Sequence, residues 1–281
     1  METYFKDKVC LVTGGSSGMG LATARLLAQN GAHVWLLARR PELLAQAMQE
    51  VAASRISPTQ RFGTVAVDVA DHERVNAAVS QVIQQAGPPD IVINSAGITE
   101  PGYLIDQDVT IIRNQMEINL MGTVHVTKAV LPGMLQRGSG YVVNICSMAG
   151  MIGVPAYTGY CASKFAVRGF SDSLRAELHP HGIDVSIVYP PDTETPQLAY
   201  DRSVRPDVLN TLLALDEPVE PEVVAKDVLQ GMQKKRYVIV PGASNRFFYW
   251  FQWILGNNRT VVMDLFYRWA VNKTNKMKAG Q

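Results

Sequence analysis

The sequence predicts an α/β fold built on a doubly wound parallel sheet, and three observations lead to this prediction. Short apolar runs rich in Val and Ile alternate with longer helical patterns through the first two thirds of the chain. These runs are apolar nearly throughout, as expected for strands that are covered on both faces. A glycine-rich turn follows the first run and opens a helix. Together, these features indicate consecutive βαβ units.

The expected elements follow one another in a regular order. The expected strands are VCLVTG, AHVWLLA, GTVAVDV, DIVINSAG, GYVVNICS, DVSIVYPP and, as a seventh, RYVIV at 236–240. The expected helices cover residues 21–30, 41–54, 71–86, 108–131 and 160–179. Residues 193–221 break into short helical pieces separated by prolines, which is typical of a lid over an active site. We therefore predict one domain over residues 1–242 that includes this lid, followed by an extension over residues 243–281.

The composition fits a folded domain and argues against nucleic-acid binding. Hydrophobic residues make up 47% of the 281 residues and charged residues 18%, which is enough apolar material for a large buried core. The formal net charge is only +1, whereas nucleic-acid binding needs a basic face or stripe. We therefore expect no nucleic-acid partner.

The cysteines and the N-terminus indicate the cellular compartment in which the protein is expected. Cys10, Cys146 and Cys161 are widely spaced and match no metal-ligand pattern, so we expect no metal and buried, reduced thiols. The N-terminus lacks the pattern of a secretory signal, and no run reaches the roughly 18 apolar residues of a membrane span. We expect a cytoplasmic protein, and a peripheral position on the cytoplasmic face of a membrane stays open.

The glycine-rich turn TGGSSGMG, at 13–20, predicts a nucleotide site. Its glycines let the backbone approach a pyrophosphate, and the N–H groups and dipole of the following helix attract negative charge. The alternative is a purely structural turn, but the position between a strand and a helix favours phosphate binding. The expected contacts are Gly14, Ser16, Ser17, Gly18, Met19 and Gly20.

The end of the second strand, WLLARR, predicts NADPH as the cofactor. An enzyme that binds NAD usually has an acidic residue here for the ribose 2′-OH, whereas Ala38 and Arg39 occupy this place. An arginine can hold a 2′-phosphate through charge-assisted hydrogen bonds, and Arg40 follows as a second candidate or as a solvated residue. Further expected contacts are Asp68 and Val69 at the adenine, and Asn94, Ala96 and Gly97 on the route to the nicotinamide.

Four residues resemble the catalytic tetrad of the short-chain dehydrogenase/reductase family, whose fold is of the Rossmann type. They are Ser147 at a strand end, Tyr160 and Lys164 in YCASK one helical turn apart, and Asn119 in EINLMGT. The resemblance covers about residues 7–240 and implies that Tyr160 is the proton donor and Ser147 holds the carbonyl oxygen. It also implies that Lys164 lowers the phenol pKa from its usual value of about 10 and binds the nicotinamide ribose. Asn119 is expected to order a water molecule.

The segment YPPDTETP carries a second resemblance. The wider family commonly has glycine where this chain has Pro191, and Pro190, Thr193 and Thr195 are expected at the nicotinamide. The segment looks like that of a branch that uses NADPH to reduce the 3-keto group of a long-chain amino alcohol. This implies the reduction of 3-ketodihydrosphingosine to dihydrosphingosine in sphingolipid biosynthesis, by an enzyme that forms a homo-oligomer. Asp192 or Glu194 is a candidate partner for the substrate ammonium.

Two other functions stay open. One is the reduction of another hydrophobic ketone, such as a steroid, a retinoid or a 3-oxoacyl compound. The other is a protein without catalysis that binds NADPH as a redox sensor, but such a protein would be expected to have a broken tetrad, and this tetrad is intact.

The extension begins with the aromatic segment RFFYWFQWIL at 246–255. Nine helical residues rise only about 14 Å, so this segment cannot cross a hydrocarbon core of about 30 Å. Tryptophan and tyrosine are favoured at membrane interfaces, where Arg246, Arg259 and Arg268 could meet anionic headgroups. The alternatives are that the rings cover the active site or bury a dimer contact.

Overall fold

A parallel sheet of seven strands forms the centre of the computed structural model, which describes residues 2–214 and 217–279. The strand order is β3-β2-β1-β4-β5-β6-β7. The strands β2 and β3 follow on one side of β1 and the later strands on the other, so the strand order reverses between β1 and β4. The strands are β1 (Val9–Thr13), β2 (His33–Ala38), β3 (Phe62–Ala66), β4 (Ile91–Asn94), β5 (Gly140–Ile145), β6 (Ile183–Val188) and β7 (Val238–Ile239). In open α/β sheets, ligands bind beyond the carboxyl ends of the strands at such a point of reversal.

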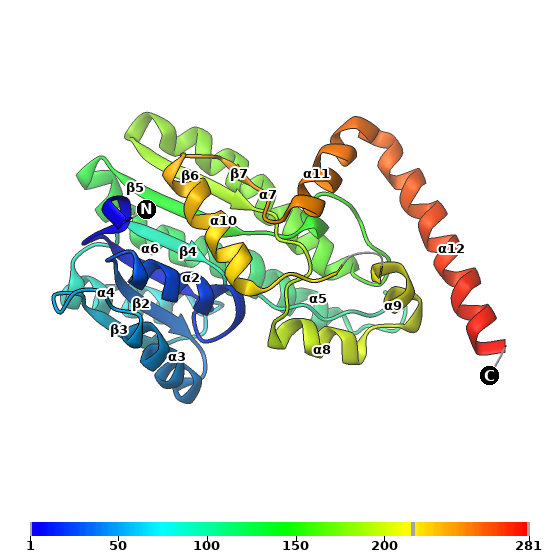
Figure 1. The fold of residues 1–281 in the computed structure, drawn as a ribbon, viewed down its shortest axis with the longest axis horizontal. Coiled ribbons are helices and arrows are strands. Elements are labelled where there is room, and N and C mark those ends of the chain that lie inside the picture. Colours follow the sequence, from blue (N-terminus) through cyan, green and yellow to red (C-terminus); the bar gives the residue numbers. More distant parts are fainter. Residues whose placement is uncertain (1, 215–216, 280–281) are drawn as a thin grey trace.

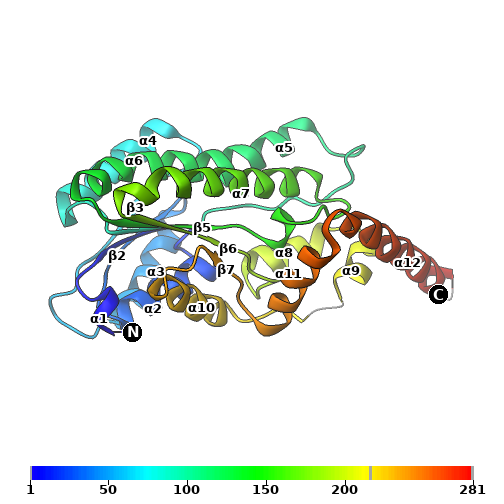
Figure 2. The same cartoon turned by 90° about the horizontal axis from the view of Figure 1, so that it is seen from above.

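Helices cover both faces of the sheet, as Figure 2 shows. One face carries α2 (Gly18–Gln29), α3 (Pro41–Ala53) and α10 (Pro221–Gln233), with the short α1 (Glu2–Phe5) at the edge. The other face carries α4 (His72–Ala86), α5 (Val109–Met116), α6 (Gly122–Arg137) and α7 (Thr158–Leu178). The predicted doubly wound α/β fold is therefore confirmed.

The predicted helix at 108–131 is wrong in two respects. Its middle is a π-helical turn at Glu117–Met121, and α6 runs past Pro132 to Arg137. A proline inside a helix costs about 3 kcal/mol, but Val130 and Met134 on either side of it are almost fully buried. Their burial offsets that cost and keeps the helix going until Gly138, which adopts the left-handed conformation that ends α6.

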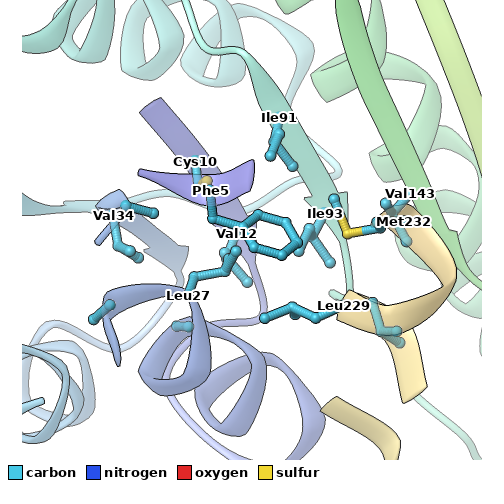
Figure 3. Packing of buried hydrophobic residues seen from close by; sticks show 14 of the residues in the cluster. Phe5, Cys10, Val12, Leu27, Val34, Ile91, Ile93, Val143, Leu229 and Met232 are labelled. Atoms are coloured by element: carbon cyan, nitrogen blue, oxygen red, sulfur yellow. The ribbon is translucent and has the colours of Figure 1, made fainter. Parts of the chain in front are cut away.

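The two largest of the four hydrophobic clusters among the described residues form two layers, one on each face of the sheet. Figure 3 shows the first layer, where Leu27 of α2 and Leu229 of α10 meet strand residues such as Val12 and Ile93. The second layer joins the opposite strand residues to α4, α6 and α7. The three cysteines are free and buried, as the sequence predicts.

The lid and the extension lie together at one end of the molecule (Figure 1). The lid contains α8 (Pro196–Val204) and α9 (Asp207–Leu213). The extension is a helical hairpin of α11 (Ala243–Leu255) and α12 (Arg259–Ala279), joined by a single 3₁₀ turn at Gly256–Asn258. Within residues 2–214 and 217–279, no helix is both long enough and apolar enough to cross a bilayer.

Leu229 tests the first core layer. Its side chain is fully buried, so Leu229→Ala removes apolar contacts and leaves a cavity. We expect a loss of about 2–5 kcal/mol in the free energy of unfolding, measured by urea denaturation. Val223→Ala on the same helix is the control, because Val223 is 43% exposed. Equal losses for the two variants would contradict this assignment of the core.

Candidate active site

The turn after β1 requires glycine because the backbone is crowded there. Gly14 has a φ of +65°, and a Cβ atom at this position would lie 2.8 Å from the carbonyl oxygen of Ser95. A Cβ atom at Gly20 would lie 2.4 Å from the carbonyl oxygen of Gly14. The missing side chains leave the peptide groups accessible to a ligand. This is the arrangement that the turn of a dinucleotide site needs.

Thr13 joins this turn to the loop that follows β4, a role that the sequence analysis missed. Its Oγ1 accepts hydrogen bonds from the backbone N–H groups of Ser95 (3.0 Å) and Ala96 (3.1 Å). The position of a threonine directly before the glycine motif is the one signal in the sequence that could have shown this. The bonds fix the phosphate turn against the loop at 94–97.

The start of α2 is available for an anion. Ser17 precedes the helix in an extended conformation, and within the described chain its side chain does not cap α2. The first N–H groups of a helix lack partners inside that helix, and they attract negative charge. A phosphate at this position would supply the acceptors.

A cavity of about 620 Å³ connects these elements with the lid and the extension. Nearly all the residues predicted to bind the cofactor line it: Gly14, Ser16, Ser17, Gly18, Met19, Gly20, Arg39, Arg40, Asp68, Val69, Ala96, Gly97, Tyr160, Pro190, Thr193 and Thr195. Ser147 lines it as well. The cavity thus runs from the arginines after β2 to the residues at the end of β5.

The side chain of Asn94 does not lie on the route to the nicotinamide, where the sequence predicts it. It is buried, and its Nδ2 donates hydrogen bonds to Thr127 Oγ1 (3.0 Å) and Asn144 Oδ1 (2.9 Å). These partners place the Asn94 amide in the interior between the sheet and α6. We therefore assign it to support of the loop at 94–97 rather than to direct contact with a cofactor.

Arg39 lies at the far end of the cavity, next to an acidic residue. Its Nη1 is 3.9 Å from Asp68 Oδ2, and both side chains are partly exposed. An exposed pair of this kind contributes little to stability, so the arginine can exchange this partner for a stronger one. A phosphate is such a partner, because an arginine can bind it with two parallel hydrogen bonds.

Ser147 and Tyr160 meet at the other end of the cavity. Ser147 follows β5 and accepts a hydrogen bond from the backbone N–H of Ala149 (3.2 Å). Burial raises the pKa of Tyr160, and the nearby Ser147 hydroxyl offsets only part of this rise. The net direction is opposite to the lowering expected from Lys164, because desolvation of the phenolate outweighs the other effects.

Lys164 lies one turn after Tyr160 on α7 and is buried. Its Nζ donates a hydrogen bond to the carbonyl oxygen of Ile145 (3.1 Å) and lies 5.6 Å from the centre of the Tyr160 ring. Burial lowers the pKa of Lys164 because the ammonium is desolvated. Lys164 therefore does not line the cavity itself but lies behind Tyr160, where β5 holds its ammonium.

The Asn119 amide is fixed by the π-helical turn and its neighbours. Its Oδ1 accepts from the N–H of Ile98 (2.8 Å), and its Nδ2 donates to the carbonyl oxygen of Ile98 (3.0 Å) and to Ser163 Oγ (2.9 Å). A Cβ atom at Gly97 would lie 3.2 Å from Asn119 Oδ1 and 3.5 Å from Lys164 Nζ. The structure thus brings Asn119 and Lys164 together beside Gly97. Single π-helical turns often occur at functional sites.

A buried network that the sequence analysis missed joins the lid to α7. The hydroxyl of Tyr157 donates to Asp201 of α8, whose two carboxylate oxygens lie 2.9 and 2.7 Å away. Arg205 Nη1 is 3.4 Å from the same carboxylate. Burial raises the pKa of Asp201, while Tyr157 and Arg205 oppose this rise. No sequence spacing indicates such a contact, because 44 residues separate the two partners.

The two acidic residues at the start of the lid, which are the candidate partners for the substrate ammonium, have different surroundings. Asp192 lines the cavity and is near enough to Tyr160 to raise its pKa further. Glu194 forms an ion pair with Arg202 at 2.9 Å. Thr195 caps α8 and also touches the phosphate turn, because a Cβ atom at Gly18 would lie 2.9 Å from Thr195 Cγ2. Asp192 is therefore the better placed of the two carboxylates.

Comparison with known proteins gives the family. The family model described as short chain dehydrogenase matches residues 8–205. A 3-dehydrosphinganine reductase from Danio rerio is 36% identical over 226 residues, which cover 79% of this chain and 68% of that protein. A dehydrogenase/reductase SDR family member 7B from Bos taurus is 36% identical over 85% of this chain and 75% of that protein. A solved short-chain dehydrogenase from Streptomyces avermitilis has a TM-score of 0.76 and 29% identity, with 98% of each chain covered.

The geometry of the cavity fits the cofactor class of that family. The side-chain-free turn at Gly14 and the start of α2 suit a pyrophosphate. Ser147 and Tyr160 line the opposite end, with Lys164 buried behind Tyr160. An oxidoreductase that uses a nicotinamide cofactor has this arrangement of parts. The chain belongs to the short-chain dehydrogenase/reductase family.

Proposed function

We propose that the protein uses NADPH to reduce the 3-keto group of 3-ketodihydrosphingosine, which yields dihydrosphingosine. The observation that carries this proposal is that one cavity joins Ser147 and Tyr160 to an apolar wall formed by the extension. A long alkyl chain needs such a wall next to the reacting ketone. The similarity to 3-dehydrosphinganine reductases supports the same substrate class.

The proposed reaction assigns one task to each residue. The nicotinamide, when bound, supplies the hydride for the carbonyl carbon. The Ser147 hydroxyl donates a hydrogen bond to the carbonyl oxygen, and Tyr160 donates its proton to that oxygen as negative charge develops there. The raised pKa of Tyr160 keeps this proton in place until the strongly basic oxygen forms. The ammonium of Lys164 then stabilises the phenolate that remains.

The same proposal assigns residues to the preference for NADPH and to the binding of the substrate ammonium. Arg39 at the adenine end of the cavity is suited to the 2′-phosphate of NADPH. Asp192 is suited to the ammonium next to the ketone, because it lines the cavity near Tyr160.

Reduction of another hydrophobic ketone is the alternative, because a relative with no substrate in its name is equally similar. The SDR family member 7B from Bos taurus is as similar in identity as the reductase from Danio rerio. Turnover of 3-ketodihydrosphingosine, a steroid ketone and a 3-oxoacyl compound, each measured as NADPH oxidation, ranks these substrates. A clear preference for one of the latter two would replace the proposed substrate.

Tyr160→Phe tests the proton donor. This change removes the phenol oxygen and keeps the ring, so cofactor affinity is retained while turnover falls by at least about a hundredfold. NADPH binding, followed by fluorescence, and NADPH oxidation with 3-ketodihydrosphingosine are the two measurements. A variant that keeps its turnover would exclude Tyr160 as the donor, and a function based on binding alone would survive the substitution.

Arg39→Ala tests the preference for NADPH. Loss of a charge-assisted contact with the 2′-phosphate costs about 1.5–3 kcal/mol, so the KM for NADPH should rise by about 10- to 100-fold. The KM for NADH should change little, because NADH lacks this phosphate. Arg40→Ala is the matched control, since Arg40 is the neighbouring arginine on the same cavity wall. If Arg40→Ala has the larger effect, the phosphate contact has been assigned to the wrong arginine.

Asp192→Asn tests recognition of the substrate ammonium. We expect the KM for 3-ketodihydrosphingosine to rise about tenfold, while the KM for the same ketone without its amino group stays unchanged. Glu194→Gln serves as the control, because Glu194 is paired with Arg202. An equal change for the two ketones would show that Asp192 does not recognise the ammonium.

A further inference from the structure

The helical hairpin of α11 and α12 has an inner side that belongs to the cavity. Phe247, Phe251 and Leu255 of α11 line the cavity at intervals of one helical turn. Val262 and Phe266 of α12 line it from the other arm of the hairpin. Part of the proposed substrate wall therefore comes from the extension. This position fits the alternative in which the aromatic residues cover the active site.

The outer side of the hairpin is also apolar, although it does not form the cavity wall. Trp250, Trp253 and Ile254 are 67%, 57% and 81% exposed. At about 100° per residue, Trp250 and Trp253 lie at least about 100° around α11 from Phe251 and Leu255, whereas Ile254 lies beside Phe247 at the edge of the cavity side. Leu265 and Trp269 are exposed on α12. Exposed apolar residues of this number on one short hairpin mark a surface for a partner or for a membrane.

The hairpin carries an excess of positive charge. The described part of the extension contains six basic residues and one acidic residue, Asp264. Arg246 and Lys278 pair with Asp227 and Asp207 of the main domain. The other basic residues are Arg259, Arg268, Lys273 and Lys276. Lys273 lies over the ring of the exposed Trp269, with its Nζ 5.0 Å from the ring centre. Tryptophan next to lysine and arginine is typical of segments that lie in the interface of an anionic membrane.

The hairpin is packed firmly onto the main domain. Asn245 Nδ2 donates to the carbonyl oxygen of Tyr189 (2.7 Å), at the end of β6. On α12, Ala270 is fully buried and the Thr274 hydroxyl is 2.9 Å from that of Thr211 in α9. The outer patch therefore has a fixed orientation relative to the cavity. Figure 2 shows α12 extending beyond the main body of the molecule.

We infer that the outer side of the hairpin docks on an anionic lipid bilayer, so that a long-chain ketone passes from the bilayer along the hairpin into the cavity. The choice of a ketone as cargo rests on the proposed function, whereas the docking does not. The 13 residues of α11 span about 20 Å, which suits a helix lying in the interface rather than crossing the bilayer. A second copy of the chain is disfavoured as the occupant, because a symmetric contact would bring like charges together.

Vesicle flotation of the full chain tests the docking. The wild-type protein should float with vesicles of phosphatidylcholine and phosphatidylglycerol, and less with pure phosphatidylcholine or in 1 M salt, where the screening length is only about 3 Å. The W250Q/W253Q variant should lose at least about tenfold in vesicle affinity, because two large rings no longer enter the interface. I56Q/V223Q, with two exposed apolar residues outside the hairpin, is the control and should float like the wild type.

Activity measurements test the passage of the ketone. W250Q/W253Q should lower turnover of 3-ketodihydrosphingosine in anionic vesicles by at least about fivefold and leave turnover of a short-chain, water-soluble analogue unchanged. Wild-type flotation of this variant would overturn the docking, and so would a loss of dimer in sedimentation with no change in flotation. If the wild type reduces neither ketone, the proposed function fails, and flotation still decides the docking.

Discussion

The close approach of the turn after β1 to the loop after β4 is the constraint on which the rest of the site depends. These two strands are neighbours at the point where the strand order reverses, so their carboxyl ends form the floor of the cavity. Gly14 provides the space for this approach and Thr13 provides the hydrogen bonds. Because the loop at 94–97 also reaches Asn119 and Lys164, the same contact sets the distance between the phosphate turn and the Tyr160 helix.

Burial controls the chemistry at the other end of the cavity. Both Tyr160 and Lys164 are desolvated. Burial raises the pKa of Tyr160 and lowers the pKa of Lys164, so it favours the neutral form of each group. Such a pair keeps the phenolic proton from being released to solvent. Negative charge that develops on a nearby oxygen makes transfer of this proton to that oxygen more favourable. A hydrophobic surrounding is therefore part of the proposed catalytic arrangement, in addition to the wall that it gives to an apolar substrate.

The sequence predicts the fold almost completely, because a parallel sheet buried on both faces has a strong pattern of apolar runs. It also predicts the residues of the cavity that belong to local motifs, such as Gly14, Gly18 and Tyr160. It misses the link between Tyr157 and Asp201, since contacts between distant segments leave no periodic signal. The extension illustrates a related difficulty. Its sequence suggests a membrane contact, a cover for the active site or a dimer contact, whereas a helix has two sides and can serve more than one of these roles.

The hairpin lies outside the residues that match the family model, yet it forms part of the cavity wall. The proposed hydride transfer and the recognition of the apolar substrate are therefore encoded in separate stretches of the chain. Changes in the hairpin can alter which ketones fit while the residues around Tyr160 stay the same. Such a division gives a protein with this fold a simple route to new substrates, because the part that changes is distant in sequence from the part that must be kept.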